Sequence, residues 1–263
     1  MPRVPTRFAD TTAIFEYHVG TSASRADARR LLQPRDEVAS SGHVEREWKR
    51  IVFTTVRDLL AALEEEEDFS AAVRRMGIGF GREPSQRWLA LALLCAGSDR
   101  VDASDIRLRA LRMLRGDMER LYRQCVGENR TASRCGLARQ IPQQDARGRW
   151  HMKTTCKRGE GICDHEARIT RDLRRWKAGA DALTSSTQPA LRKMGALANE
   201  MADDPGIRTG VNTYGRTGDL AIALDCKVGE LIVTTDVSFT VLAPAMGVQV
   251  HRIPSSTASG ART

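Results

Sequence analysis

The chain has 263 residues, of which 41% are hydrophobic and 5% aromatic, enough to bury a core in one domain or two. Its 41 Lys and Arg against 33 Asp and Glu give a net charge of +8, which favours a polyanionic partner such as a nucleic acid. No apolar run is long enough to span a bilayer, and the first residues lack the apolar stretch of a signal peptide. We therefore expect a cytoplasmic protein with no membrane partner. The high content of Arg and Ala indicates a bacterial source.

The first 63 residues combine strand and helix patterns. Phe8 and Ala9 predict a first strand that ends at Asp10, and residues 37–40 predict a second. A helix over residues 24–32 lies between them. A long helix starts at Val44, because apolar residues recur there at spacings of three and four. Glu45 and Glu47 both lie near its start, where a carboxylate favours the helix dipole.

Residues 64–205 predict a mainly α-helical insertion. Helical patterns cover residues 69–76, 84–96, 169–183 and 188–201, and Ser104 is expected to cap a further helix that runs to Cys125. The glycines that follow residue 76 predict a break in the first of these helices. Pro205 disfavours a helical conformation at Asp204, so the last helix is expected to stop there.

A polar segment inside this insertion contains four cysteines, Cys125, Cys135, Cys156 and Cys163. Few apolar residues surround them, so we do not expect burial alone to order the segment. Four thiolates can hold a structural Zn²⁺, and the binding energy would then contribute to folding. The spacing of the cysteines does not match common zinc ribbons. An iron–sulfur cluster and unrelated reduced thiols therefore stay open as alternatives.

The same region is basic. Residues 126–180 carry 13 Lys and Arg against 6 Asp and Glu, a net charge of +7 out of the chain's +8. Basic side chains neutralise phosphates, and an aromatic ring can stack on an unpaired base. We expect a nucleic-acid-binding cluster made of Arg147, Arg149, Trp150, Lys153, Lys157 and Arg158. An ordinary solvated loop is the alternative.

Residues 206–254 alternate helix and strand. Asp219 opens a short apolar helix, and Asp236 ends a strand over residues 230–235 that is apolar on both faces. Such strands belong in the middle of a parallel sheet covered by helices. A helix over 238–245 and a strand over 248–253 follow. An acid just past the carboxyl end of a central strand lies where open α/β sheets place their sites. Residues 255–263 predict a disordered tail.

Short motifs at both ends of the chain resemble the PIN domain family of metal-dependent nucleases. They are Asp10-Thr11-Thr12 after the first strand, Ser41-x-x-Val44-x-x-Glu47 at the long helix, Gly218-Asp219, and Thr235-Asp236. The resemblance covers the two chain ends and not the middle, and Thr12 replaces the commoner Asn or Ser. It implies an α/β, PIN-like three-layer fold with a central parallel sheet. That core would be built from residues 1–63 and 206–254, with residues 64–205 inserted.

The resemblance also implies a site. Asp10, Glu47, Asp219 and Asp236 would be its catalytic acids, and they would bind Mg²⁺ or Mn²⁺ with Asp10 and Asp236 as the direct ligands. Crowded carboxylates repel one another, and a bound cation offsets that cost. Mg²⁺ prefers carboxylate oxygens and can activate water beside a phosphate. The implied activity is an endonuclease, with RNA as the favoured substrate.

The resemblance also implies smaller roles for neighbouring residues. The hydroxyls of Thr12 and Thr235 are expected to donate hydrogen bonds to the carboxylates. Asp225, further along the same helix as Asp219, is a weaker candidate, and Glu45 competes with Glu47.

Two other function classes stay open. The chain could be a nucleic-acid-binding protein without turnover, or a zinc-containing interaction protein on a PIN-like scaffold. A homodimer or an inhibitory protein partner is compatible with each of these.

Overall fold

A parallel sheet forms the centre of the computed structural model, which describes residues 7–66, 68–79, 102–130, 136–154, 164–205 and 216–254. In these residues the sheet has five strands in the order β3-β2-β1-β6-β7, and every neighbouring pair is parallel. The strands are β1 (Arg7–Ala9), β2 (Val38–Ser41), β3 (Glu128–Arg130), β6 (Leu231–Thr234) and β7 (Gln249–Arg252). The predicted α/β class and parallel sheet are therefore confirmed.

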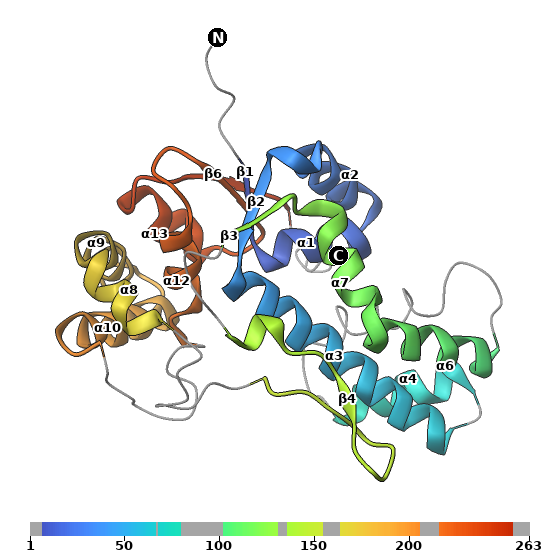
Figure 1. Ribbon diagram of the computed structural model, residues 1–263. Helices are drawn as coiled ribbons and strands as arrows, with labels where there is room; N and C mark the ends of the chain where they lie inside the picture. The colour runs from blue at the N-terminus through green and yellow to red at the C-terminus, as the bar shows by residue number, and fades with distance from the viewer. Residues whose placement is uncertain are drawn as a thin grey trace.

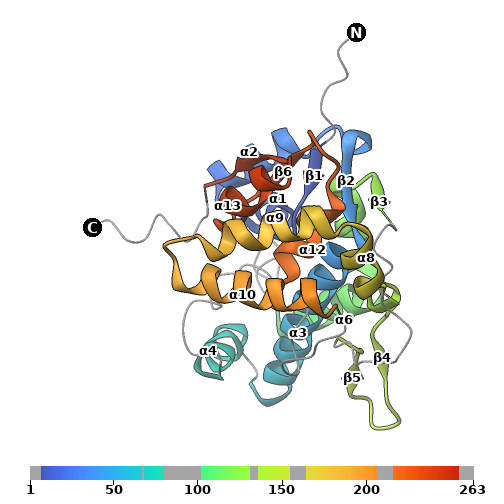
Figure 2. The same ribbon diagram turned by 90° about the vertical axis from the view of Figure 1, so that its left-hand side faces the viewer.

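Helices cover both faces of this sheet, as Figure 1 shows. One face carries α1 (Thr11–Val19), α2 (Ser22–Leu31) and α7 (Met118–Cys125). The other carries α12 (Gly218–Asp225) and α13 (Ser238–Ala245). Outside them α9 (Leu173–Thr184) packs against α12 and α13, and α10 (Pro189–Asp203) packs against α9 with α8 (His165–Arg171) beside it. Figure 2 shows α9 and α10 in front of the sheet.

The long helix α3 (Gly42–Glu65) leaves the carboxyl end of β2 and runs away from the sheet (Figure 1). Its predicted apolar stripe is buried, and the indole of Trp48 donates a hydrogen bond of 2.8 Å to the carbonyl of Met118 on α7. The far half of α3 packs against α4 (Phe69–Gly79) and α6 (Ala103–Arg112). A hairpin of β4 (Gln143–Gln144) and β5 (Trp150–His151) projects near it (Figure 2). Short helical turns cover Arg35–Glu37 (η1), Met113–Asp117 (η2) and Gly136–Arg139 (η3).

The order of the strands reverses between β1 and β6. From β1 the chain adds β2 and then β3 on one side, whereas β6 and β7 lie on the other. Helices that start from neighbouring strands at such a point diverge to opposite faces, which leaves a crevice at the carboxyl ends of the strands. The topology therefore marks the carboxyl ends of β1 and β6 as the place for a site.

Strand β3 lies within the segment predicted to be a helical insertion. Its sequence, Glu128-Asn129-Arg130, is short and polar, so hydrophobic periodicity could not reveal it. Backbone pairing to β2 holds the strand, and buried Arg130 makes two hydrogen bonds of 2.5 Å to the carboxylate of Glu230. The Arg130 guanidinium also lies 5.7 Å from the centre of the Phe8 ring. The middle of the chain thus contributes a strand to the central sheet.

Helices α8 and α9 are attached to the carboxyl end of α12 by arginines. Arg168 donates to the carbonyl of Leu224 at 2.7 Å, and Arg175 donates to the carbonyl of Cys226 at 3.0 Å. Cations at this end of a helix are stabilised by its dipole and by its unpaired carbonyls. Arg168 also forms a buried ion pair with Asp225. This pairing gives Asp225 a structural role and removes it as a weaker site candidate.

Several element boundaries differ from the predictions. Helix α4 continues through Gly79 instead of breaking after residue 76, because glycine lowers helix propensity without forbidding a helix. Helix α6 is capped by Asp102, whose carboxylate accepts a 2.9 Å hydrogen bond from the backbone of Asp105, and not by Ser104. The predicted end of the last insertion helix is confirmed, since α10 stops at Asp203. The predicted helix over 84–96 and the tail over 255–263 lie outside the described residues.

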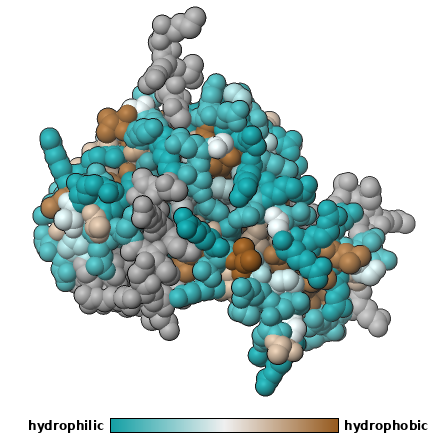
Figure 3. Space-filling model, in the orientation of Figure 1, coloured by the Kyte–Doolittle hydropathy of each residue, from teal (hydrophilic) through white to brown (hydrophobic). Residues whose placement is uncertain are grey.

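The face drawn in Figure 3 is mainly hydrophilic, with scattered apolar patches. In the described part of the chain the large exposed apolar residues are Leu108, Ile141 and Val228. None of the described helices combines the length and the apolar character that crossing a membrane requires.

Candidate active site

Asp10 lies directly after β1 and is buried. It caps the start of α1, where its carboxylate accepts a 2.7 Å hydrogen bond from the hydroxyl of Thr12. A second hydroxyl, that of Thr234 at the end of β6, donates to the same carboxylate at 2.9 Å. Asp10 therefore caps a helix and also lies at the edge of the sheet where a site is expected.

Glu47 approaches this position from the second turn of α3. Its carboxylate accepts a hydrogen bond of 2.8 Å from the hydroxyl of Thr11, the residue after Asp10. The competing candidate, Glu45, pairs instead with Lys49 at 2.8 Å and accepts a hydrogen bond from Asn129. Of the two glutamates, Glu47 is the one that the structure brings to Asp10.

Asp219 and Asp236 approach Asp10 from the other side of the point where the strand order reverses between β1 and β6. Asp219 is in the first turn of α12, and its carboxylate accepts a 2.6 Å hydrogen bond from the hydroxyl of Ser238. Asp236 follows β6, and its carboxylate accepts a 2.9 Å hydrogen bond from the backbone of Ser238. One serine at the start of α13 therefore holds both carboxylates.

The charges of these acids act on one another. Burial, and next the charge of Glu47, raise the pKa of Asp10 to about 6. Burial, and next the charge of Asp236, raise the pKa of Asp219 to about 8, and the charges of Asp10 and Glu47 add to this rise. Hydrogen bonds from the neighbouring hydroxyls lower both pKa values in part. The four acids thus form one electrostatic cluster, although they come from four different elements.

This cluster has the donor chemistry of a site for Mg²⁺ or Mn²⁺, because its members are carboxylates whose repulsion a cation would relieve. Within the described residues, no group of three or more His, Cys, Asp or Glu side chains is arranged to hold a metal ion. The closest electrostatic partners are instead two pairs, Asp10 with Glu47 and Asp219 with Asp236. A small number of carboxylates suits Mg²⁺, which keeps several of its water ligands.

Three hydroxyl residues that hold the acids, Thr11, Thr234 and Ser238, were not expected from the sequence. The predicted hydrogen bond from Thr12 to a carboxylate is present, whereas Thr234 takes the place expected for Thr235. Thr235 contributes its backbone N–H, which donates to the hydroxyl of Thr12 at 2.9 Å. Thr11 and Ser238, which hold Glu47 and Asp219, carried no signal beyond being hydroxyl residues beside acids.

Cys125 does not have the surroundings of a zinc ligand. Its side chain lies in the hydrophobic core at the end of α7, where burial raises the pKa of the thiol to about 12. The thiol is 3.4 Å from the carbonyl of Tyr122 one turn earlier. A thiol that stays protonated in an apolar core is a poor metal ligand. Cys135, Cys156 and Cys163, the other members of the predicted site, lie outside the described residues.

The predicted basic cluster is partly described. Arg147 and Arg149 lie at the turn of the β4–β5 hairpin, where their backbone N–H groups donate to Asp145. Trp150 is half-buried and packs against the hydrophobic core, and Lys153 follows the hairpin. Lys157 and Arg158 lie outside the described residues. The hairpin therefore carries arginines at its turn, and Trp150, in the strand pair next to the turn, packs against the core.

No protein-family model, curated protein or solved structure matches the chain. The candidate site therefore rests on the topology of the sheet and on the hydrogen bonds and charges around the four acids.

Proposed function

We propose that the chain is a metal-dependent nuclease with a PIN-like fold, which hydrolyses phosphodiester bonds and has RNA as its favoured substrate. One observation carries the proposal: Asp10, Glu47, Asp219 and Asp236 form one electrostatic cluster around the point where the strand order reverses. Open α/β sheets place their sites there, and phosphodiester hydrolysis uses clustered carboxylates to hold Mg²⁺ or Mn²⁺.

In this proposal Asp10 and Asp236 hold the cation, and Glu47 and Asp219 complete its surroundings directly or through water. When bound, the cation would supply an activated water and neutralise charge on the phosphate oxygens. The chain's own groups fix the acids: Thr12 and Thr234 orient Asp10, and Ser238 orients the pair opposite. This preorganisation lowers the cost of arranging charges during the reaction.

Proton binding is linked to cation binding at this cluster. Burial and the neighbouring charges raise the pKa of Asp219 to about 8 when no cation is bound, so a cation that neutralises these charges would favour release of the proton.

Cleavage of labelled single-stranded RNA with Mn²⁺ tests the proposal. The unmodified chain is compared with an Asp10→Asn plus Asp236→Asn variant. Asp36→Asn plus Asp203→Asn is the matched control, because it removes the same charge at two exposed positions. We expect Mn²⁺-dependent cleavage by the chain and the control, and none by the site variant. Cleavage that survives in the site variant, or binding without any cleavage by the unmodified chain, would overturn the proposal. Binding alone would favour a nucleic-acid-binding protein without turnover.

A further inference from the structure

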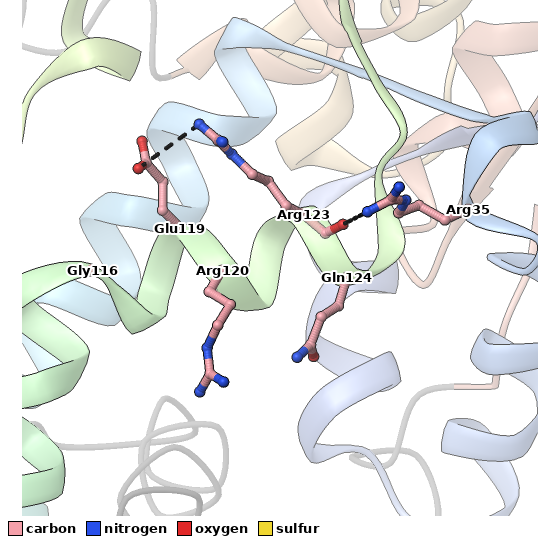
Figure 4. A pocket seen from close by; sticks show the side chains of 6 residues that line it. All are labelled: Arg35, Gly116, Glu119, Arg120, Arg123 and Gln124. Carbon is pink, nitrogen blue, oxygen red and sulfur yellow. Dashed lines mark hydrogen bonds and ion pairs between the residues drawn. The ribbon is translucent and has the colours of Figure 1, made fainter.

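Two hollows adjoin on the outer side of α7. The first has a volume of about 400 Å³ and is lined by Arg35, Gly116, Glu119, Arg120, Arg123 and Gln124 (Figure 4). The second has a volume of about 220 Å³, and its lining includes Trp150, Ile141, Pro142, Lys49 and Glu119. The hollows share Gly116 and Glu119, so they are neighbours on one surface.

The first hollow is rich in arginine. In Figure 4, Arg120 and Gln124 project from one side of α7, Arg123 projects from the other side toward Glu119, and Arg35 reaches the helix from η1. The side chains of Arg120 and Arg123 are 62% and 72% exposed, and their nearest carboxylates are 3.4 Å and 3.9 Å away. Exposed ion pairs of this length contribute little, so phosphate oxygens can compete for both guanidinium groups.

The lining of the second hollow is partly apolar and partly polar. Trp150, Pro142 and Ile141 supply the apolar part, and Ile141 is 61% exposed. The polar part includes Lys49, whose ammonium group is 2.8 Å from Glu119 and 2.6 Å from the carbonyl oxygen of Ala138. Pockets for drug-sized ligands measure roughly 300–1,000 Å³, so this smaller hollow suits a single flat ring system.

The backbone between the two hollows is irregular. Within Met113–Asp117, Gly116 has a φ of 158° and a non-helical backbone conformation, which kinks the chain between α6 and α7. A Cβ at Gly116 would meet nothing within 4 Å, so the glycine serves the backbone conformation and not close packing.

We propose that the two hollows bind one unpaired nucleotide of a single strand, with its base against Trp150 and its flanking phosphates on Arg120 and Arg123. The inference rests on the proposed function, since the strand would be the substrate. An aromatic wall binds any base by stacking, and arginines beside it follow the backbone of the strand. The surface therefore grips single strands without reading their sequence.

The position of the hollows sets a distance along the strand. Lys49 and Glu47 are two residues apart on α3, which gives a rise of about 3 Å and a rotation of about 200°. The hollow therefore lies across α3 from the carboxylates. Crossing a helix about 10–12 Å wide takes about three nucleotides of a stacked strand, given a rise of about 3.4 Å each. The gripped nucleotide would lie that far from the cleaved phosphate, so shorter strands would be poor substrates.

Fluorescence anisotropy with a labelled single-stranded RNA of about 12 nucleotides tests the contact, in EDTA so that no cleavage occurs. Trp150→Ala is expected to weaken binding roughly 5- to 150-fold, whereas Trp150→Phe retains most of the affinity. Arg120→Gln plus Arg123→Gln is expected to lower the salt dependence of log K by about 1.4. Arg57→Gln plus Arg107→Gln, at two exposed arginines outside both hollows, should leave affinity and slope closer to those of the unmodified chain.

The outcomes separate this inference from the proposed function. Unchanged affinity in Trp150→Ala together with an unchanged salt slope in the two-arginine variant would overturn the inference, even if the chain cleaves RNA. A Trp150-dependent affinity without cleavage in Mn²⁺ would support the contact and overturn the nuclease. Displacement of the strand by equimolar adenosine monophosphate would show a mononucleotide site and overturn the strand contact. Trp150 packs against the core, so circular dichroism must show each variant folded; the two-arginine variant changes only exposed side chains.

Discussion

The hydroxyl of Thr234 donates a 2.9 Å hydrogen bond to the carboxylate of Asp10, although the two residues are 224 positions apart in the chain. The same hydroxyl accepts a 2.9 Å hydrogen bond from the backbone of Asp236. One side chain at the end of β6 therefore links two of the four acids. The link depends on the pairing of β1 with β6, which sets Ala9 opposite Val233.

Replacing Thr234 with Val, whose side chain has a similar volume, should impair the site. The substitution removes a hydrogen bond that lowers the pKa of Asp10, so that pKa should rise above about 6. We expect slower RNA cleavage and an acid limb shifted to higher pH in a profile of kcat/KM. Thr240→Val, at an exposed position of α13, is the matched control. An acid limb that stays in place would show that Thr234 does not tune Asp10.

Asp219→Asn should stabilise the fold at pH 8 when divalent cations are absent. The folded-state pKa of Asp219 is raised from 3.8 to about 8, so between these values the folded state keeps a proton that the unfolded state has released. Stability therefore falls as the pH rises through this window, and asparagine removes the loss. We expect a gain of about 1–3 kcal/mol in the free energy of unfolding at pH 8.

Urea denaturation at pH 4 and pH 8 measures this effect. The gain should be small at pH 4, where the folded-state carboxyl is already protonated, and Asp203→Asn at an exposed position should show none at either pH. Mn²⁺ should stabilise the unmodified chain more than the variant, because binding to the folded state adds stability. A gain of equal size at both pH values would contradict the electrostatic cause.

Substitutions of Glu47 and Glu45, the two glutamates near the start of α3, should have different effects: the first on RNA cleavage and the second on stability. Glu47→Gln removes a charge that raises the pKa of Asp10, so we expect an unchanged or higher stability and a loss of cleavage of about 100-fold or more. Glu45→Gln weakens the pairing of buried Lys49 and should cost about 1–3 kcal/mol of stability while cleavage by the folded protein persists. Parallel urea and cleavage measurements compare the two variants. A loss of cleavage in Glu45→Gln, together with a loss of stability in Glu47→Gln, would instead place Glu45 at the site.

Arg168→Met should destabilise the protein strongly. It leaves the buried carboxylate of Asp225 without its ion pair and removes a donor to the carbonyl of Leu224, which we expect to cost about 3–5 kcal/mol. Urea denaturation followed by circular dichroism measures the loss. Lys177→Met, which removes an exposed ion pair with Asp203, should change stability by only about 0.5 kcal/mol. A small effect of Arg168→Met would show that α8 contributes little to holding α12.

The sequence predicted the elements whose patterns are local. The apolar stripe of α3 and the β-branched run of β6 gave a helix and a central strand, because periodicity and burial are properties of neighbouring residues. The predicted α10 is also present, and its end at Asp203 follows from the proline two residues later. β3 was missed because a three-residue polar strand carries no such pattern.

Only the tertiary structure decided which polar side chains meet. The sequence supplied four acids in order, but not that Ser238 holds two of them or that Thr234, and not Thr235, reaches Asp10. It offered Asp225 and Cys125 as site candidates, and their surroundings in the fold gave the first an arginine partner and the second an apolar core. The physical reason is that a hydrophobic pattern is a property of residues that are neighbours in the chain. A hydrogen bond or a charge interaction instead requires two side chains to lie within a few ångströms, and strand order and register decide which distant segments come that close.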